Sequence, residues 1–113
     1  MTKIDYVELP SDDLPATQAF LKAAFGWGFV DYGPNYQAFA DAGLDGGIDG
    51  SGERSAGALL VILKSDDLIA SEAAVREAGG TITVPPYGFP GGRRFHFREP
   101  GGNELAIWAE TTA

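Results

Sequence analysis

The 113-residue sequence has no cysteine, one histidine and only eight lysine and arginine residues. The absence of cysteine excludes disulfides, thiol chemistry and cysteinyl metal sites. The sequence contains 16 acidic residues, so the formal net charge is −8, which argues against a nucleic-acid partner. The same balance is compatible with a cationic small molecule, or with acids that only keep the protein in solution.

Long apolar runs are also missing. No run approaches the ~18 residues that a membrane-spanning helix needs, so we expect no membrane partner. The residues from Met1 to Asp5 contain no apolar core of a signal peptide, which predicts a cytoplasmic protein. With 44% hydrophobic and 21% charged residues, the composition is typical of a folded domain, and the length predicts a single one.

The sequence Ser-Asp-Asp-Leu occurs twice, at Ser11–Leu14 and at Ser65–Leu68. At the same offset, Tyr6–Leu9 aligns with Leu60–Leu63. Such a duplication indicates two supersecondary modules, neither of which could bury its apolar face alone. We therefore predict one domain over residues 1–113, with modules at about 1–50 and 57–110 and a polar linker at 50–57.

The first module is predicted to begin with a strand over Lys3–Leu9, because its residues alternate with period two. Ser11–Asp13 is an N-cap cluster for a helix that ends at Gly26. We expect strands at 27–32, 36–41 and 44–48, and a buried helix face formed by Leu14, Leu21, Ala24 and Phe25.

The second module repeats this order, with a strand at 58–63, a helix at 68–78 and strands at 81–84, 93–98 and 104–109. Pro85 and Pro86 are predicted to end the strand at 81–84. Residues 85–92 are then a turn-rich loop, either at the rim of a binding site or as a plain connection. The predicted class is α+β: two βαβββ modules that form a curled mixed sheet around a cup, with one helix per module outside.

The closing segment, residues 97–105, reads Phe-Arg-Glu-Pro-Gly-Gly-Asn-Glu-Leu. Together with the two caps and the module order, it resembles the vicinal oxygen chelate superfamily, which includes glyoxalase I, bleomycin-resistance proteins, fosfomycin-resistance enzymes and extradiol dioxygenases. Glu99 stands where the signature usually has aspartate. The resemblance covers the whole chain and implies a homodimer.

In the metal-dependent members, ligands to a divalent ion lie on the first and last strands of the modules. The resemblance assigns these roles here to Tyr6, Leu60, Ala106 and the segment around Gly46–Ile48. Since a divalent ion needs several nitrogen or oxygen donors, we predict no metal and no cofactor. Relocated ligands remain an alternative, drawn from Glu8, Asp45, His96 and Glu104.

Strand alternation predicts which side chains line the cup. Glu8 could instead pair with Arg94 or Arg98, His96 could be a hydrogen-bonded strand residue, and Glu104 could anchor the neighbouring turn. Tyr6 and Trp108 could simply fill space. The predicted ligand-binding residues are Tyr6, Glu8, Tyr36, Leu60, Ile62, Arg94, His96, Glu104 and Trp108.

The sequence thus favours a non-catalytic protein that binds a small, partly apolar molecule in a metal-free cup, with the acidic balance favouring a cation. The alternative is a glyoxalase-like lyase or isomerase, or a dioxygenase-type enzyme. It would use relocated metal ligands, or acid–base chemistry with His96 or Glu8 as the base and Tyr6 as the proton donor. A third reading is an assembly domain.

Overall fold

The computed structural model describes residues 2–111. The chain forms two compact units, of which the first is Tyr6–Leu60 and the second holds the residues from Val61 onward together with those up to Asp5. Strand β1 (Lys3–Pro10) therefore contributes to both units. Neither helix of the described chain has the length and apolar character to cross a membrane.

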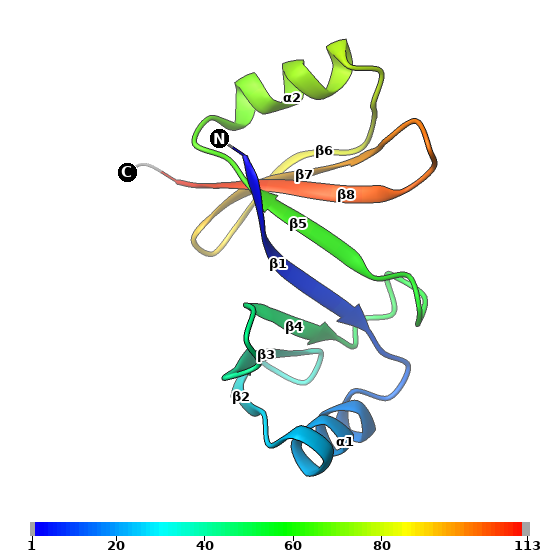
Figure 1. The fold of residues 1–113 in the computed structure, drawn as a ribbon. Coiled ribbons are helices and arrows are strands. Elements are labelled where there is room, and N and C mark those ends of the chain that lie inside the picture. The colour runs from blue at the N-terminus through cyan, green and yellow to red at the C-terminus, as the bar shows by residue number, and fades with distance from the viewer. Residues whose placement is uncertain (1, 112–113) are drawn as a thin grey trace. The chain divides into compact units, whose positions relative to one another are not determined.

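The first unit contains α1 (Leu14–Phe25) and the strands β2 (Gly28–Asp31), β3 (Tyr36–Ala40) and β4 (Gly46–Asp49). Its strands lie in the order β2-β3-β4-β1, in which β1 and β4 are parallel and the other pairs antiparallel. Helix α1 packs against one face of this sheet (Figure 1).

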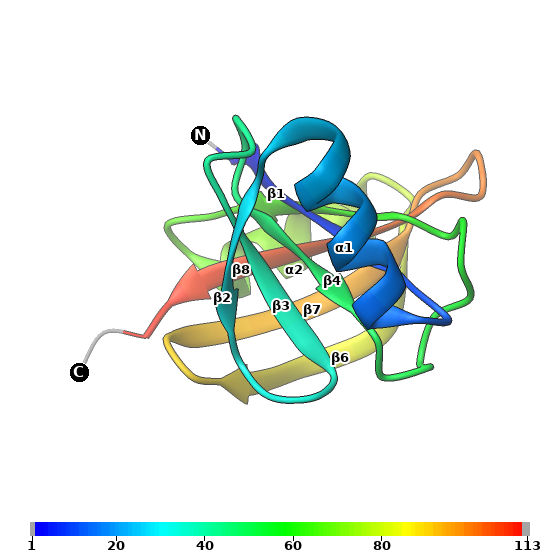
Figure 2. The ribbon, with the colours of Figure 1, turned by 90° about the horizontal axis from the view of Figure 1, so that it is seen from below.

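The second module contains β5 (Leu60–Lys64), α2 (Leu68–Glu77), β6 (Thr81–Phe89), β7 (Gly92–Arg98) and β8 (Glu104–Glu110). Its strand order, β5-β8-β7-β6, matches that of the first unit when read from the opposite end. Strands β5 and β8 are parallel, and β6 and β7 form a long antiparallel hairpin (Figure 2). This order confirms the predicted α+β class with two βαβββ modules.

Both helices begin in the same way, as the repeated Ser-Asp-Asp-Leu predicts. The Asp13 carboxylate accepts a hydrogen bond from the Ala16 amide at 3.1 Å, and the Asp67 carboxylate accepts one from the Ala70 amide, also at 3.1 Å. Each carboxylate satisfies an amide that the helix itself leaves without a partner.

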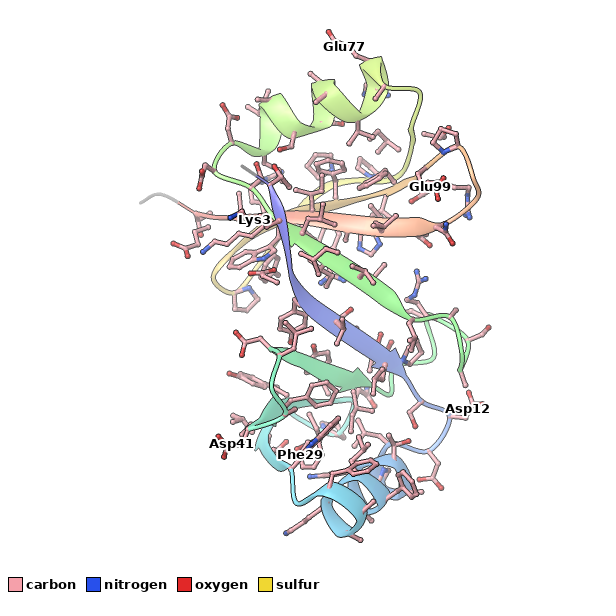
Figure 3. The ribbon with its side chains drawn as sticks, viewed as in Figure 1. Lys3, Asp12, Phe29, Asp41, Glu77 and Glu99 are labelled. Carbon is pink, nitrogen blue, oxygen red and sulfur yellow. The ribbon has the colours of Figure 1, made fainter. Side chains whose placement is uncertain are left out.

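The core of the first unit lies between α1 and its sheet, and it differs in part from the prediction. Leu14 and Leu21, seven residues apart on one stripe of the helix, pack with Ile48. Phe29 joins this core from β2 (Figure 3). Ala24 and Phe25 were wrongly predicted to be buried. Both are exposed, because only the narrow stripe of α1 reaches the sheet, and the Phe25 ring packs instead on Phe20 and Trp27.

The predicted break at Pro85 and Pro86 is wrong, because β6 continues as a strand to Phe89. The two prolines are tolerated because β6 is the edge strand of its sheet, and because neither proline is paired with β7, whose register shifts between Val84 and Tyr87. The pairing with β7 shifts register on both sides of Val84. The predicted turn-rich loop shrinks to the tight turn between Phe89 and Gly92.

Candidate functional site

Three of the predicted site residues form a hydrogen-bonded chain in the first unit. Tyr6 and Glu8 are two residues apart on β1, so both point away from α1, whereas Leu9 packs against the core. The Tyr36 hydroxyl on β3 lies 2.5 Å from the Tyr6 hydroxyl and 3.0 Å from a Glu8 carboxylate oxygen.

The carboxylate fixes the direction of this chain. The Tyr36 hydroxyl donates a hydrogen bond to a Glu8 carboxylate oxygen, so the Tyr36 oxygen accepts the hydrogen bond from the Tyr6 hydroxyl. Burial raises the pKa of Tyr36 most strongly, and the nearby charge of Glu8 and the bond to Tyr6 raise it further. Tyr36 therefore stays protonated, and the oxygen of Tyr6 can only accept further hydrogen bonds.

The position of Tyr36 depends on a glycine. In the parallel pair of β1 and β4, Glu8 lies opposite Gly47. A Cβ atom at Gly47 would come within 2.4 to 2.5 Å of the Tyr36 hydroxyl and ring. The missing side chain at Gly47 thus makes the space in which the Tyr36 ring lies beside Glu8, which itself is only 7% exposed.

A second polar chain lies in the second unit and contains three other predicted residues, Arg94, His96 and Glu104. The Nε of Arg94 lies 2.6 Å from the Tyr87 hydroxyl and 3.2 Å from Nε2 of His96. The Tyr87 hydroxyl is 3.3 Å from the same Nε2, and Nδ1 of His96 is 3.3 Å from a Glu104 carboxylate oxygen. Thr83 donates to that oxygen at 3.0 Å.

The strand register explains why these side chains meet. Arg94 and His96 are two residues apart on β7 and share a face of the sheet. His96 lies opposite Ala106 on β8, whose small side chain leaves room for the imidazole to reach Glu104, the diagonal neighbour. Tyr87 lies opposite Arg94 on β6, the strand that pairs with the other edge of β7.

The contacts also assign the tautomer of His96. The Nε of arginine can only donate, so Nε2 of His96 is an acceptor and carries no proton in this arrangement. The proton of the neutral imidazole is then on Nδ1, facing Glu104. His96 itself is 7% exposed. A Glu104 carboxylate oxygen thus lies beside Nδ1 of the buried imidazole, and the lone pair of Nε2 faces both Arg94 and the Tyr87 hydroxyl.

The remaining predicted residues do not join either chain. Leu60 and Ile62 on β5 are buried hydrocarbon side chains, exposed by 0% and 2%. Trp108 on β8 donates its indole N–H to Asp5 at 3.1 Å, and its ring lies 5.0 Å from the Lys64 ammonium. Trp108 therefore ties the start of β1 to β8 within the second unit.

Sequence reasoning left Tyr87 and Thr83 out of the site. The alternation of β7 places Arg94 and His96 on one face. This pattern could have indicated that residues of the neighbouring strand β6 contact them. The assumption that Pro85 and Pro86 end the strand removed Tyr87 from any register. The ligand-binding and catalytic roles themselves stay predictions.

Comparison with known proteins identifies the family. A model described as the Glyoxalase/Bleomycin resistance protein/Dioxygenase superfamily matches residues 3–107. The chain belongs to this superfamily. The resemblance predicted from the closing segment and the two caps is thereby confirmed. No protein of curated function matches the sequence.

Solved structures of the superfamily share the fold. A Mn(II)-bound glyoxalase from Novosphingobium aromaticivorans superposes with a TM-score of 0.70 at 25% identity, over 95% of this chain and 38% of that one. A superfamily member from Vibrio splendidus 12B01 gives 0.73 at 14% identity, over 98% and 100% of the two chains. Streptomyces coelicolor methylmalonyl-CoA epimerase, in complex with 2-nitronate-propionyl-CoA, gives 0.68 at 16% identity, covering 99% of each.

The residues at the superfamily's metal-ligand positions do not fit a divalent ion. The register identifies the loosely aligned fourth position as Gly47, since it pairs with Glu8 as Ala106 pairs with Ile62. Gly47, Leu60 and Ala106 offer no side-chain donor, and only the Tyr6 hydroxyl remains. Elsewhere in residues 2–111, no three histidine or acidic side chains gather in a geometry that could hold a metal ion.

Proposed function

We propose that this protein binds a small, partly apolar cation, and that the Tyr6–Tyr36–Glu8 chain supplies its charged partner. The observation that carries the proposal is the direction of this chain, in which the Tyr6 hydroxyl donates to Tyr36 and the Tyr36 hydroxyl donates to a carboxylate that is 7% exposed. The oxygen of Tyr6 only accepts, so the group that it recognises must be a donor. An ammonium or amidinium N–H satisfies that requirement.

The chemistry around the chain supports a ligand of this class. Two phenol rings beside a carboxylate offer both a negative charge and aromatic faces, which attract cations. Donors and acceptors in a hydrogen-bonded chain polarise one another, which strengthens the acceptor at the end. The net charge of −8 adds a long-range attraction for cations.

The test is a titration of the full-length protein with a panel of basic aromatic amines, followed by the fluorescence of Trp27 and Trp108. For the tightest binder, Glu8→Gln should weaken binding about ten- to a hundredfold, because a hydrogen bond to a charged group contributes about 1.5–3 kcal/mol. A neutral isostere of the same amine should bind both proteins equally.

Glu110→Gln is the matched control. It removes the same charge from an exposed side chain, which pairs with Lys64 on the surface of the second unit. Its effect on binding should be less than about twofold, because salt screens exposed charges. An equal loss in both variants would show that only net charge matters, and no response across the panel would exclude the proposal.

A further inference from the structure

The second unit contains a group that cation binding does not use: a carboxylate, an imidazole and a hydroxyl in series. Glu104 faces Nδ1 of His96 at 3.3 Å, and Nε2 of His96 faces the Tyr87 hydroxyl at 3.3 Å. Hydrolases activate a nucleophile with the same arrangement, in which a carboxylate orients an imidazole and the imidazole faces a hydroxyl. The arrangement recurs on unrelated folds and with different orders of the residues in the sequence.

We infer that Tyr87 is a nucleophile, activated by His96, that cleaves aryl esters through an acyl-tyrosine intermediate. This activity goes beyond the proposed cation binding and does not depend on it. Three features of the site carry the inference: the tautomer of His96, the contact from Arg94, and the difference in exposure between the base and the nucleophile.

The tautomer places the lone pair where a base needs it. Because the Nδ1 proton faces Glu104, Nε2 can take the Tyr87 proton, and the carboxylate stabilises the imidazolium that results. Thr83 donates to the same oxygen of Glu104 at 3.0 Å and restricts its rotation. Glu104 is thus a positioning residue, and His96 is the base.

Arg94 acts on the nucleophile itself. Its Nε donates to the Tyr87 oxygen at 2.6 Å, and its guanidinium carbon lies 5.8 Å from the centre of the Tyr87 ring. A cation at this distance stabilises the negative charge that forms on the oxygen as the proton leaves. Tyr87 is 37% exposed whereas His96 is 7% exposed, so a solute can reach the nucleophile while the base stays shielded.

The reaction balances with water as the only co-reactant. The Tyr87 oxygen bonds to the ester carbonyl carbon and its proton passes to His96. The carbon–oxygen bond to the aryl group then breaks, and the aryloxide leaves with the electron pair and takes up that proton. Water next attacks the acyl-tyrosine, gives its proton to His96, and releases the carboxylic acid as Tyr87 regains a proton. Phenoxide is a weaker base than alkoxide, so attack by a phenol favours aryl esters over alkyl esters.

The test treats the full-length protein with p-nitrophenyl acetate and follows both p-nitrophenol release and acetylated residues by peptide mass spectrometry. Tyr32 is the internal control, because it is 68% exposed and has no imidazole contact among the described interactions. We expect acetyl groups on Tyr87 before Tyr32, although Tyr32 is more accessible. Labelling of Tyr32 first, or of both equally, would overturn the inference.

Variants give independent readouts. Tyr87→Phe should abolish the acyl intermediate, whereas Tyr32→Phe should leave the rate unchanged. His96→Gln should slow p-nitrophenol release roughly a hundredfold, as expected for loss of a general base. Wild-type rates in Tyr87→Phe would overturn the inference even if His96→Gln failed to fold.

Glu104→Gln distinguishes a positioning role from a structural one. Of the described contacts of His96, those with Arg94 and Tyr87 do not favour the imidazolium, whereas the carboxylate of Glu104 does. Its removal should therefore move the acidic limb of the pH–rate profile to lower pH, as well as lower the rate. A lower rate with an unmoved limb would contradict the positioning role.

Discussion

The two units share one framework but arrange their polar groups differently. The strand registers define equivalent positions: Glu8 lies opposite Gly47, and Ile62 lies opposite Ala106. In the same way, Ala38 faces Gly47 and His96 faces Ala106. The first unit thus has its buried acid where the second has isoleucine, and the second has its imidazole where the first has alanine.

This exchange teaches how a duplicated fold diverges. A buried polar side chain is retained only with a hydrogen-bond partner, and in each unit the partner comes from another strand of the same sheet. Tyr36 provides it for Glu8 across the sheet of the first unit. Tyr87 provides it for His96 from β6, and Glu104 on β8 places a carboxylate oxygen 3.3 Å from the other ring nitrogen. The framework permits either solution because alternation puts these positions on the same face of each sheet.

The largest expected effect on stability concerns Gly46 of β4. The first unit needs a glycine at this position, whereas the second unit does not need one at the equivalent position of β8. A Cβ at Gly46 would lie 2.2 Å from the Val7 carbonyl oxygen and 2.9 Å from the Phe39 ring, whereas Leu105 occupies the equivalent position of β8. Gly46→Ala should lower the free energy of unfolding, measured with urea, by about 3 kcal/mol.

Gly88→Ala on β6 is the control for this substitution, because no atom lies within 4 Å of the added Cβ. Its free energy of unfolding should stay within about 0.5 kcal/mol of the wild type. If both alanine variants were equally stable, the close packing that distinguishes β4 from β8 would be refuted.

The two helix caps should contribute equally to the free energy of unfolding, because their geometry is the same in both units. Asp13 and Asp67 accept at 3.1 Å and have φ angles of −147° and −148°. Asp13→Ala and Asp67→Ala should each lower the free energy of unfolding by about 1 kcal/mol.

The double variant should lose the sum of the two cap effects, because distant and independent sites add. Urea unfolding of all four proteins measures the cycle. A cap loss confined to one unit would show that the repeated Ser-Asp-Asp-Leu no longer has the same role in both.

The smallest effect concerns the turns that follow β3 and β7. The first turn begins at Asp41, whose φ is 61°, whereas the second is closed by Glu99 (Figure 3). Hydrogen bonds from the Asn103 side chain and then from the Gly101 amide lower the pKa of Glu99 below its usual value. Asn103→Ala should raise this pKa toward the usual value, as followed by carboxyl NMR during an acid titration.

The lowered pKa of Glu99 makes the stability of the folded protein depend on pH. Because the folded pKa of Glu99 is the lower one, its contribution is present above the usual carboxyl pKa of about 4.3 and is lost as pH falls through the folded value. In Asn103→Ala this acid-dependent loss should shrink. An unchanged Glu99 titration in that variant would refute the role of Asn103.

Much of the fold was predictable because its signals are local. Ser11–Leu14 and Ser65–Leu68 mark two helix starts, and period-two alternation marks β1 and β7. The errors have equally physical causes. Phe25 is apolar and lies at the end of the helix, but the narrow contact stripe of α1 leaves it outside the core. Pro85 and Pro86 do not break β6, because the strand lies at the edge of its sheet and its pairing with β7 skips both residues.

The sequence by itself determined the repeated caps, the order of elements and the lack of a side-chain donor at Leu60 and Ala106, since these depend on residue type and spacing. Only the tertiary structure decided which polar residues meet. Tyr36 reaches Glu8 through the space above Gly47, and Tyr87 reaches His96 through the register shifts of β6. Such pairings depend on strand register, and a shift of one residue turns a side chain to the other face.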